Sequence, residues 1–238
     1  MKKEALEWEG RIINDDCMNI LTKIPNQSVD LILTDPPYEL HQIGGVGKSG
    51  LGKRAKTMRD SIKFVSDGFD YEKVFQEFKR ICKPLNLYIF CSNKQITKIM
   101  SYFEKDYPTT LLVWHKTNAI PLANKTYQSN VEFIVCVRDE GSTFNNLSID
   151  KKSKVISMAY PVGYRIHPTQ KPVALIQRLL EIKSNEGDIV LDPFSGSGTT
   201  AIACHRMKRK FICIEKDFTF WKESVKMLED EQKQGELF

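Results

Sequence analysis

The chain of 238 residues is 41% hydrophobic and 27% charged, with a formal net charge of +5. This composition is typical of an ordinary globular protein, so we expect a single main domain spanning 1–238. No stretch approaches the roughly 20 apolar residues of a membrane span, and no apolar run follows the first lysines. The sequence therefore predicts neither a membrane segment nor an export signal, and we expect the protein in the cytoplasm.

The six cysteines form no Cys-x-x-Cys pair, and most of them lie in apolar runs such as LYIFCS and FIVCV. This pattern indicates reduced core thiols rather than disulfides or a zinc site. We therefore expect no metal in this protein.

Short apolar runs alternate with segments of helical periodicity along the chain, which favours a βαβ layout and a mostly parallel sheet. Apolar residues at the 3.6-residue spacing predict helices at 70–83 and 172–183. Two stretches, 39–68 and 138–165, fit neither pattern. The expected strands are 10–14, 29–33, 87–91, 110–115, 132–137, 188–192 and 211–215.

The second of these strands ends abruptly. Residues 31–40 read LILTDPPYEL, in which an apolar run reaches Asp35 and is stopped by Pro36 and Pro37. Each proline fixes its own φ and holds the preceding residue extended, so this backbone is rigid and cannot enter a helix. Taken alone, the stretch is equally consistent with an ordinary turn.

The stretch 39–68 follows directly and is rich in Gly, Ser and Lys. Between His41 and Lys63 it has six basic residues and one acidic residue, a local net charge of 6 − 1 = +5, so the rest of the chain is balanced. Such a loop is suited to a polyanion, or is a solvated loop without a partner. The side chains that we expect to contact nucleic-acid phosphates are Lys48, Lys53, Arg54, Lys56 and Arg59.

A second landmark lies nearer the C-terminus. Residues 187–204 read GDIVLDPFSGSGTTAIAC, a strand that ends in Asp192, a turn with Gly196 and Gly198, and a helical pattern. The next strand ends in Glu215, where nucleotide-binding folds place a carboxylate on ribose hydroxyls. Strand, glycine turn, helix and acid together predict a cofactor that contains a nucleoside.

Charge favours S-adenosylmethionine over other nucleoside cofactors. A dinucleotide fingerprint requires a third glycine where this chain has Thr200 and Ala201, and Asp192 would repel a pyrophosphate. The same acid suits the ammonium and sulfonium groups of S-adenosylmethionine. An ATP site is disfavoured because Gln42 in QIGGVGKSG stands where a P-loop has glycine.

The motifs TDPPY (34–38), HPTQKP (167–172) and DPFSGSG (192–198), with the acid that ends FICIE, resemble those of the S-adenosylmethionine-dependent DNA amino-methyltransferases. The sequence is most similar to their beta group, in which the catalytic motif precedes the cofactor motif. The resemblance covers essentially the whole chain. It implies a Rossmann-like α/β methyltransferase fold, with a mostly parallel sheet, helices on both faces and one antiparallel strand pair. It also implies double-stranded DNA as the partner.

In that family the catalytic motif is Asp/Asn/Ser-Pro-Pro-Tyr, which maps onto Asp35, Pro36, Pro37 and Tyr38. The Asp35 carboxylate and the Pro36 carbonyl can each accept an N–H of an exocyclic amine, which turns the nitrogen lone pair toward the methyl group. Transfer is then a direct displacement without a covalent enzyme intermediate. Tyr38 offers the flipped base a stacking surface worth roughly 1–3 kcal/mol.

The resemblance also implies a set of cofactor-binding residues. His167 and Lys171 match the segment that lies against the methionine part of the cofactor, although a turn before a helix explains them as well. Asp16 matches an acid near the cofactor's adenine or caps a helix, and Phe194 stacks on or near the cofactor adenine or a base, or belongs to the core. The complete expected set is Asp16, Asp35, His167, Lys171, Asp192, Phe194, Gly196, Gly198, Thr199 and Glu215.

Asp35 favours the N6 amine of adenine as the target, because the cytosine-N4 members of the family more often carry Ser-Pro-Pro-Tyr. Transfer to cytosine N4 is the alternative, whereas methylation of RNA or of a protein glutamine is disfavoured. The intact motifs argue against an inactive DNA-binding module. We expect 138–165 to recognise the target sequence, and a homodimer or a partner endonuclease of a restriction-modification system is compatible with this class.

Overall fold

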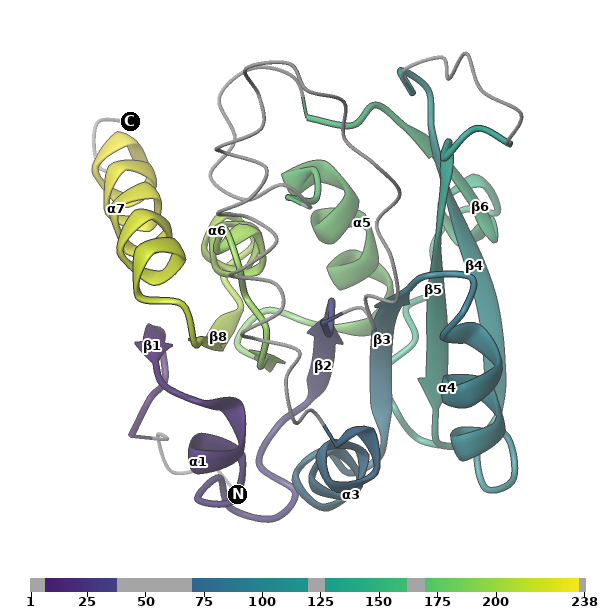
Figure 1. Ribbon diagram of the computed structural model, residues 1–238, viewed down its shortest axis with the longest axis horizontal. Coiled ribbons are helices and arrows are strands. Elements are labelled where there is room, and N and C mark those ends of the chain that lie inside the picture. Colours follow the sequence, from purple (N-terminus) through teal and green to yellow (C-terminus); the bar gives the residue numbers. More distant parts are fainter. Residues whose placement is uncertain (1–6, 38–69, 120–126, 162–169, 236–238) are drawn as a thin grey trace, which may run out of the picture.

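The computed structural model describes residues 7–37, 70–119, 127–161 and 170–235. The strands within these residues form one eight-stranded sheet in the order β1-β8-β7-β2-β3-β5-β4-β6 (Figure 1). The strands are β1 (Arg11–Asn14), β2 (Leu31–Thr34), β3 (Asn86–Cys91), β4 (Thr109–Lys116), β5 (Val131–Arg138), β6 (Val155–Met158), β7 (Ile189–Asp192) and β8 (Lys210–Glu215).

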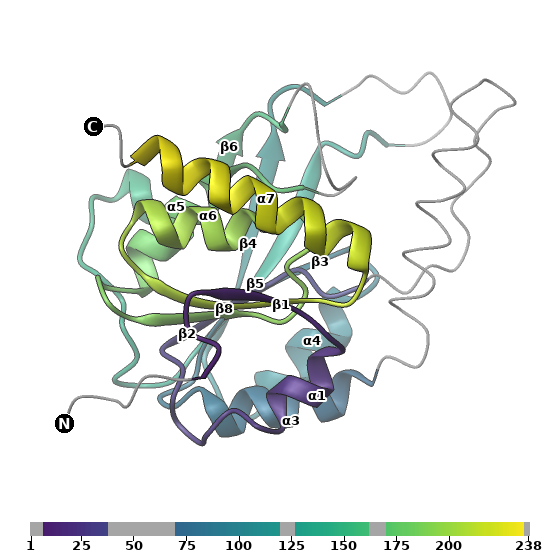
Figure 2. The ribbon, with the colours of Figure 1, turned by 90° about the vertical axis from the view of Figure 1, so that its left-hand side faces the viewer.

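Helices cover both faces of this sheet (Figure 2). One face carries α1 (Cys17–Leu21), α3 (Tyr71–Ile81) and α4 (Ile96–Phe103). The opposite face carries α5 (Val173–Lys183), α6 (Thr199–Arg206) and α7 (Phe218–Gly235). A short 3-10 helix, η1 (Asp150–Lys152), precedes β6. The expected Rossmann-like α/β fold with helices on both faces is thereby confirmed.

Strand direction determines what meets at the functional edge of the sheet. Strand β5 runs antiparallel to both of its neighbours, β3 and β4, and every other pairing between the named strands is parallel. The carboxyl ends of the parallel strands therefore lie along one edge, and the amino end of β5 lies there too. Ligands of open α/β sheets bind at this edge.

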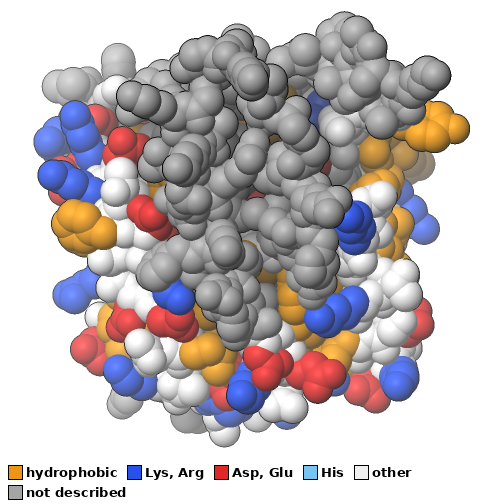
Figure 3. Space-filling model, viewed as in Figure 1, with side chains coloured by type: hydrophobic (Ala, Val, Ile, Leu, Met, Phe, Trp, Pro, Cys, Tyr) orange, Lys and Arg blue, Asp and Glu red, His pale blue; other side chains and the backbone are white. Residues whose placement is uncertain are grey.

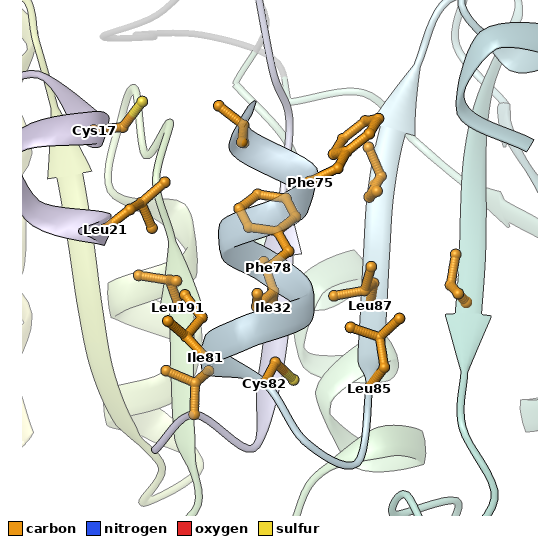
Figure 4. Packing of buried hydrophobic residues seen from close by; sticks show 14 of the residues in the cluster. Cys17, Leu21, Ile32, Phe75, Phe78, Ile81, Cys82, Leu85, Leu87 and Leu191 are labelled. Carbon is orange, nitrogen blue, oxygen red and sulfur yellow. The ribbon is translucent and has the colours of Figure 1, made fainter. Parts of the chain in front are cut away.

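The core lies between the sheet and its helices. All residues of β2 and β3 are buried, as expected for central strands covered on both faces. Figure 4 shows Phe75, Phe78 and Ile81 of α3 in one hydrophobic cluster with Ile32 and Leu87 of these two strands. Burying each of these side chains stabilises the folded protein by about 1.5–3 kcal/mol. This packing therefore fixes the positions of the central strands and of their carboxyl ends.

The expected strands and the two expected helices all appear within a few residues of their predicted bounds. The stretch 138–165, which fitted no pattern, contains β6. This strand has four residues at the edge of the sheet and buries only Ile156. A strand with one buried residue leaves no alternating pattern, so periodicity could not reveal it.

Candidate active site

Three carboxylates from separate parts of the chain meet at the carboxyl edge. Asp35 directly follows β2, Asp192 ends β7 and Glu215 ends β8. These three strands are neighbours in the sheet, so the two landmarks of the sequence lie side by side. Asp192 and Glu215 are buried, and the Asp35 side chain is 20% exposed. The edge therefore brings together three carboxyl groups with limited access to water.

The glycine turn between β7 and α6 is held by two of these acids. Asp192 accepts hydrogen bonds from Thr200 Oγ1 at 2.6 Å and from the Phe194 amide at 3.2 Å. Glu215 accepts from the Gly196 amide at 2.8 Å through Oε2, and from the Asp217 amide at 2.8 Å through Oε1. The turn thus has a defined shape before any ligand binds.

Gly198 has a positive φ of 75° where the turn enters α6. A Cβ at this position would lie 2.9 Å from the Cβ of Ser224 in α7. Glycine is therefore required both by the backbone conformation and by the close approach of α7.

Burial shifts both turn-associated acids toward their neutral forms. It raises the pKa of Asp192 to about 6, even though hydrogen bonds from Thr200 and Phe194 oppose the shift. It likewise raises the pKa of Glu215 to about 7, against the hydrogen bonds from Asp217 and Gly196. A cation or a hydroxyl donor at this edge would stabilise the ionised forms.

The rigid Asp-Pro-Pro backbone is supported by two side chains that the sequence analysis did not identify. Tyr71, the first residue of α3, donates its hydroxyl to the Pro37 carbonyl at 2.7 Å. Gln95 donates to the Tyr71 hydroxyl oxygen at 2.5 Å, and its side chain is held by Ser92. These bonds fix the end of β2, and no local motif predicts them because Tyr71 reads as a core residue of the helix.

Lys171, from the HPTQKP segment, lies against the Asp35 carboxylate. Its ammonium also pairs with Glu132 Oε2 at 3.2 Å, and Glu132 Oε1 pairs with Lys116 Nζ at 2.7 Å. Lys116 lies at the edge because it ends β4, and Glu132, the second residue of β5, lies there because β5 is antiparallel to β4. The sequence analysis identified Lys171 but neither Glu132 nor Lys116.

The remaining expected cofactor residues within the described chain also lie at or near this edge. Asp16 caps α1 by accepting from the Met18 amide at 3.0 Å, and it pairs with Lys216, which follows Glu215, at 3.1 Å. Thr199 is the first residue of α6 and is buried, with its hydroxyl 2.9 Å from that of Ser197. Phe194 is half-buried against the core cluster.

Several predicted residues lie outside the described part of the chain: Tyr38, His167, and the basic residues Lys48, Lys53, Arg54, Lys56 and Arg59. The whole stretch 39–68 lies outside the described residues. On the face seen in Figure 3, described acidic and basic side chains are interspersed. This agrees with a charge balance over the chain outside that stretch.

The described part of 138–165 is anchored to the sheet and to α5. The Asn145 side-chain amide donates to the carbonyls of Glu181 and Ser184, and β6 pairs with β4. Near the carboxyl edge this segment brings Tyr160 onto Trp114, with ring centroids 5.9 Å apart. Lys116 Nζ lies 5.3 Å from the Tyr160 ring centroid.

The donor set of the edge fits S-adenosylmethionine. Asp35 and Asp192 can balance a sulfonium and an ammonium, and the Glu215 carboxylate suits a ribose diol. Ser195 Oγ, in the glycine turn, is buried without a hydrogen-bond partner among the described residues, as expected for a group that awaits a ligand.

Two negative findings concern the described residues alone. No group of three or more His, Cys, Asp or Glu side chains there is arranged to hold a metal ion. Among the helices of this part of the chain, none is both long and apolar enough to cross a membrane.

Comparison with known proteins places this site in a family. The family model described as DNA methylase of the N6_N4_Mtase type matches residues 29–226. Type II methyltransferase M.HpaI from Haemophilus parainfluenzae is 31% identical over 232 residues, covering 87% of this chain and 70% of that protein. Type II methyltransferase M.HinfI from Haemophilus influenzae is 28% identical over 251 residues, covering 91% and 67%.

Solved structures give the same result. The complex of M1.HpyAVI with S-adenosylmethionine has a TM-score of 0.70 and 26% identity, covering 92% of this chain and 98% of that one. The PvuII DNA methyltransferase, described as cytosine-N4-specific, has a TM-score of 0.68 at 14% identity, covering 93% and 90%. The second likeness concerns the fold alone.

The fold and its acidic edge define a Rossmann-like methyltransferase that uses S-adenosylmethionine. Within that class the chain belongs to the N6/N4 family of DNA amino-methyltransferases. The family and the cofactor inferred from the motifs are thereby confirmed.

Proposed function

We propose that this protein transfers a methyl group to the N6 amine of adenine in double-stranded DNA after flipping the base out of the helix. The observation that carries the proposal is the position of Asp35. It lies at the end of a buried strand beside Asp192, and it is paired with the Lys171 ammonium. A carboxylate in this place can accept an N–H from an amine that enters the edge.

In the proposed reaction, the residues of the carboxyl edge have separate roles. When bound, S-adenosylmethionine supplies a methyl group on a cationic sulfonium. Asp35 and the Pro36 carbonyl accept the two N–H groups of the target amine and so direct its lone pair at that methyl group. The bonds from Tyr71 and Gln95 hold this backbone in place while the amine reacts. Tyr38, in the same motif, is proposed to stack on the flipped base.

DNA contacts are assigned to two parts of the chain. The basic residues of 39–68 are proposed to neutralise phosphates beside the flipped base, because this stretch holds the whole excess positive charge. The segment 138–165 is proposed to read the target sequence, since its described part brings Tyr160 near Lys116 and the catalytic edge. His167 is proposed to contact the methionine part of the cofactor.

The test is methyl transfer from labelled S-adenosylmethionine to unmethylated double-stranded DNA, followed by digestion to nucleosides and mass spectrometry. We expect N6-methyldeoxyadenosine. Label in N4-methyldeoxycytidine would replace adenine by cytosine as the target and leave the family unchanged. DNA that stays unlabelled although the protein binds its cofactor would contradict the proposal.

The biological role of the methyltransferase and its partners are also proposals. The relatives M.HpaI and M.HinfI are named type II methyltransferases, which supports a role in restriction-modification in the cytoplasm. Such a role includes a partner endonuclease, and a homodimer is a further expectation. Sedimentation of the purified chain with and without DNA tests the homodimer.

A further inference from the structure

Four side chains of alternating charge run from the catalytic carboxylate into the sheet edge: Asp35, Lys171, Glu132 and Lys116. They come from four separate places, namely the end of β2, the approach to α5, the start of β5 and the end of β4. The Lys171 side chain is 6% exposed, and those of Glu132 and Lys116 are 18% and 15% exposed. Because these side chains are largely shielded from water, solvent screens the ion pairs only weakly, and each charge interacts strongly with its neighbours.

Lys171 and Glu132, the two inner members of this series, are both ionised. Burial disfavours the Lys171 ammonium, but Asp35 and Glu132 outweigh it and raise the pKa of Lys171 above its ordinary value. Burial likewise acts against the Glu132 carboxylate, yet Lys171 and Lys116 hold the pKa of Glu132 below its ordinary value. Lys171 therefore remains a cation that two carboxylates share.

A cation in this position creates a conflict for the proposed reaction, on which this inference rests. Asp35 must accept an N–H from the target amine, and it must do so next to a sulfonium. An ammonium bound to Asp35 alone would compete for the same oxygens and would repel the sulfonium. A second carboxylate that attracts the ammonium and offsets its charge removes both difficulties.

We propose that Glu132 is a positioning residue of the methyl-transfer site: it shares the Lys171 ammonium with Asp35, which frees Asp35 to receive the target amine beside a cationic cofactor. Glu132 is itself fixed by Lys116 at 2.7 Å, and Trp114 lies directly opposite Glu132 in the β4–β5 register. Lys116 is in turn bordered by the rings of Trp114 and Tyr160, at 5.4 and 5.3 Å.

Stability alone does not explain this arrangement. Removing charges from water costs about as much as their attraction returns, so a buried ion pair is weak support for a fold. Four such charges at the edge where the ligand binds, rather than within either hydrophobic cluster, indicate a role in the reaction.

The first test compares a cationic ligand with a neutral one. Glu132→Gln removes one negative charge with little change in shape. We expect the dissociation constant of S-adenosylmethionine, measured by calorimetry, to rise about tenfold. That of S-adenosylhomocysteine, which lacks the sulfonium charge, should change less than about twofold. If the substitution only loosened the structure, the affinity for both ligands would fall by the same factor, and that outcome would overturn the proposal.

The second test asks whether Glu132 acts through Lys171. In single turnovers, Glu132→Gln should slow methyl transfer about tenfold in the wild-type background and by much less in a Lys171→Met background. Fully additive losses would contradict the shared-ammonium arrangement.

Two further variants keep these tests decisive. Glu132→Asp retains the charge and should preserve most of the preference for the cationic ligand, even if Glu132→Gln fails to fold. Glu229→Gln makes the same chemical change at an exposed position of α7 and should leave the affinity for both ligands and the rate unchanged.

The proposed function and the role of Glu132 can fail separately. If the wild type binds S-adenosylmethionine but methylates no DNA, the proposed function fails, while the comparison of the two ligands still decides the role of Glu132.

Discussion

Asp35 is the residue on which the proposed chemistry depends most directly, and its role differs from that of Glu215 two strands away. In the proposed reaction Asp35 acts on the target amine in the transition state, whereas Glu215, which ends β8, is expected to bind the cofactor ribose in the ground state. Substitutions at the two positions should therefore separate catalysis from cofactor affinity.

Asp35→Ala should lower the rate of methyl transfer by at least about 10³-fold. The dissociation constant of S-adenosylmethionine should rise much less, because the hydrogen bond that is removed is made mainly to the target amine. Single-turnover assays and calorimetry on the same preparation check both values. Asp230→Ala, an exposed aspartate of α7, is the control. A loss of cofactor binding as large as the loss of rate would remove Asp35 from its catalytic role.

Glu215 should make cofactor binding depend on pH. Because burial raises the pKa of Glu215 to about 7, part of the free protein carries the neutral acid near neutrality. Ribose hydroxyls donate to the ionised form, so binding releases a proton and affinity should rise with pH. Titrations between about pH 6.5 and about pH 8.5 lie above the pKa of Asp192, about 6, and so report mainly on Glu215.

In that window we expect the affinity for S-adenosylmethionine to rise severalfold and then level off above about pH 8. Glu215→Gln should bind more weakly and lose this dependence. A variant that kept the wild-type pH profile would show that another group titrates.

At the scale of elements, the turn between β7 and α6 combines a ligand-facing loop with a tight helix contact. Gly198 has φ +75°, and a Cβ added there would lie 2.9 Å from the Ser224 Cβ of α7, whereas Gly187 has φ +82° and a Cβ added there would meet nothing within 4 Å. The pair separates backbone strain from crowding, because only Gly198 experiences both.

Gly187→Ala should destabilise the protein by about 1–2 kcal/mol from the left-handed conformation alone. Gly198→Ala should cost about 1–3 kcal/mol more, because the added methyl group must displace α7. Chemical denaturation of the two variants and the wild type measures the difference. Equal losses would mean that α7 yields without cost, and Ser224→Gly should recover part of the Gly198→Ala loss if crowding is the cause.

At the scale of the whole molecule, the charge distribution separates a basic stretch from a balanced remainder. If the proposed DNA contacts are correct, this distribution lets the protein bind DNA through the stretch 39–68, while the balanced remainder adds little electrostatic attraction to DNA. Cofactor binding should be unaffected by charges in that stretch.

Replacing Lys53, Arg54 and Lys56 by Ala should weaken DNA binding and reduce the slope of log affinity against log salt by about 0.9 for each phosphate that is no longer neutralised. The dissociation constant of the cofactor should stay the same. The control replaces Lys222, Lys226 and Lys233 of α7, which removes the same net charge elsewhere. Parallel salt plots with equal affinity for wild type and loop variant would assign recognition to 138–165 or to a partner chain.

Local patterns in the chain were enough to predict the central strands, the two amphipathic helices and the acids that end β2, β7 and β8. The reason is physical: a buried strand is a continuous apolar run, and a carboxylate or proline that stops it is visible in a window of ten residues. Parallel strands then bring their carboxyl ends to one edge, so Asp35, Asp192 and Glu215 could be grouped before their positions were known.

Glu132, Lys116, Tyr71 and Gln95 could not be assigned in this way. Glu132 reaches the site because β5 runs against its neighbours, and strand direction depends on how distant segments pair rather than on local periodicity. Lys171 meets Asp35 across 136 positions of the chain. A charged side chain in the sequence looks the same whether water or another ion surrounds it, and the partner that makes it part of a site is supplied by the packing of the sheet.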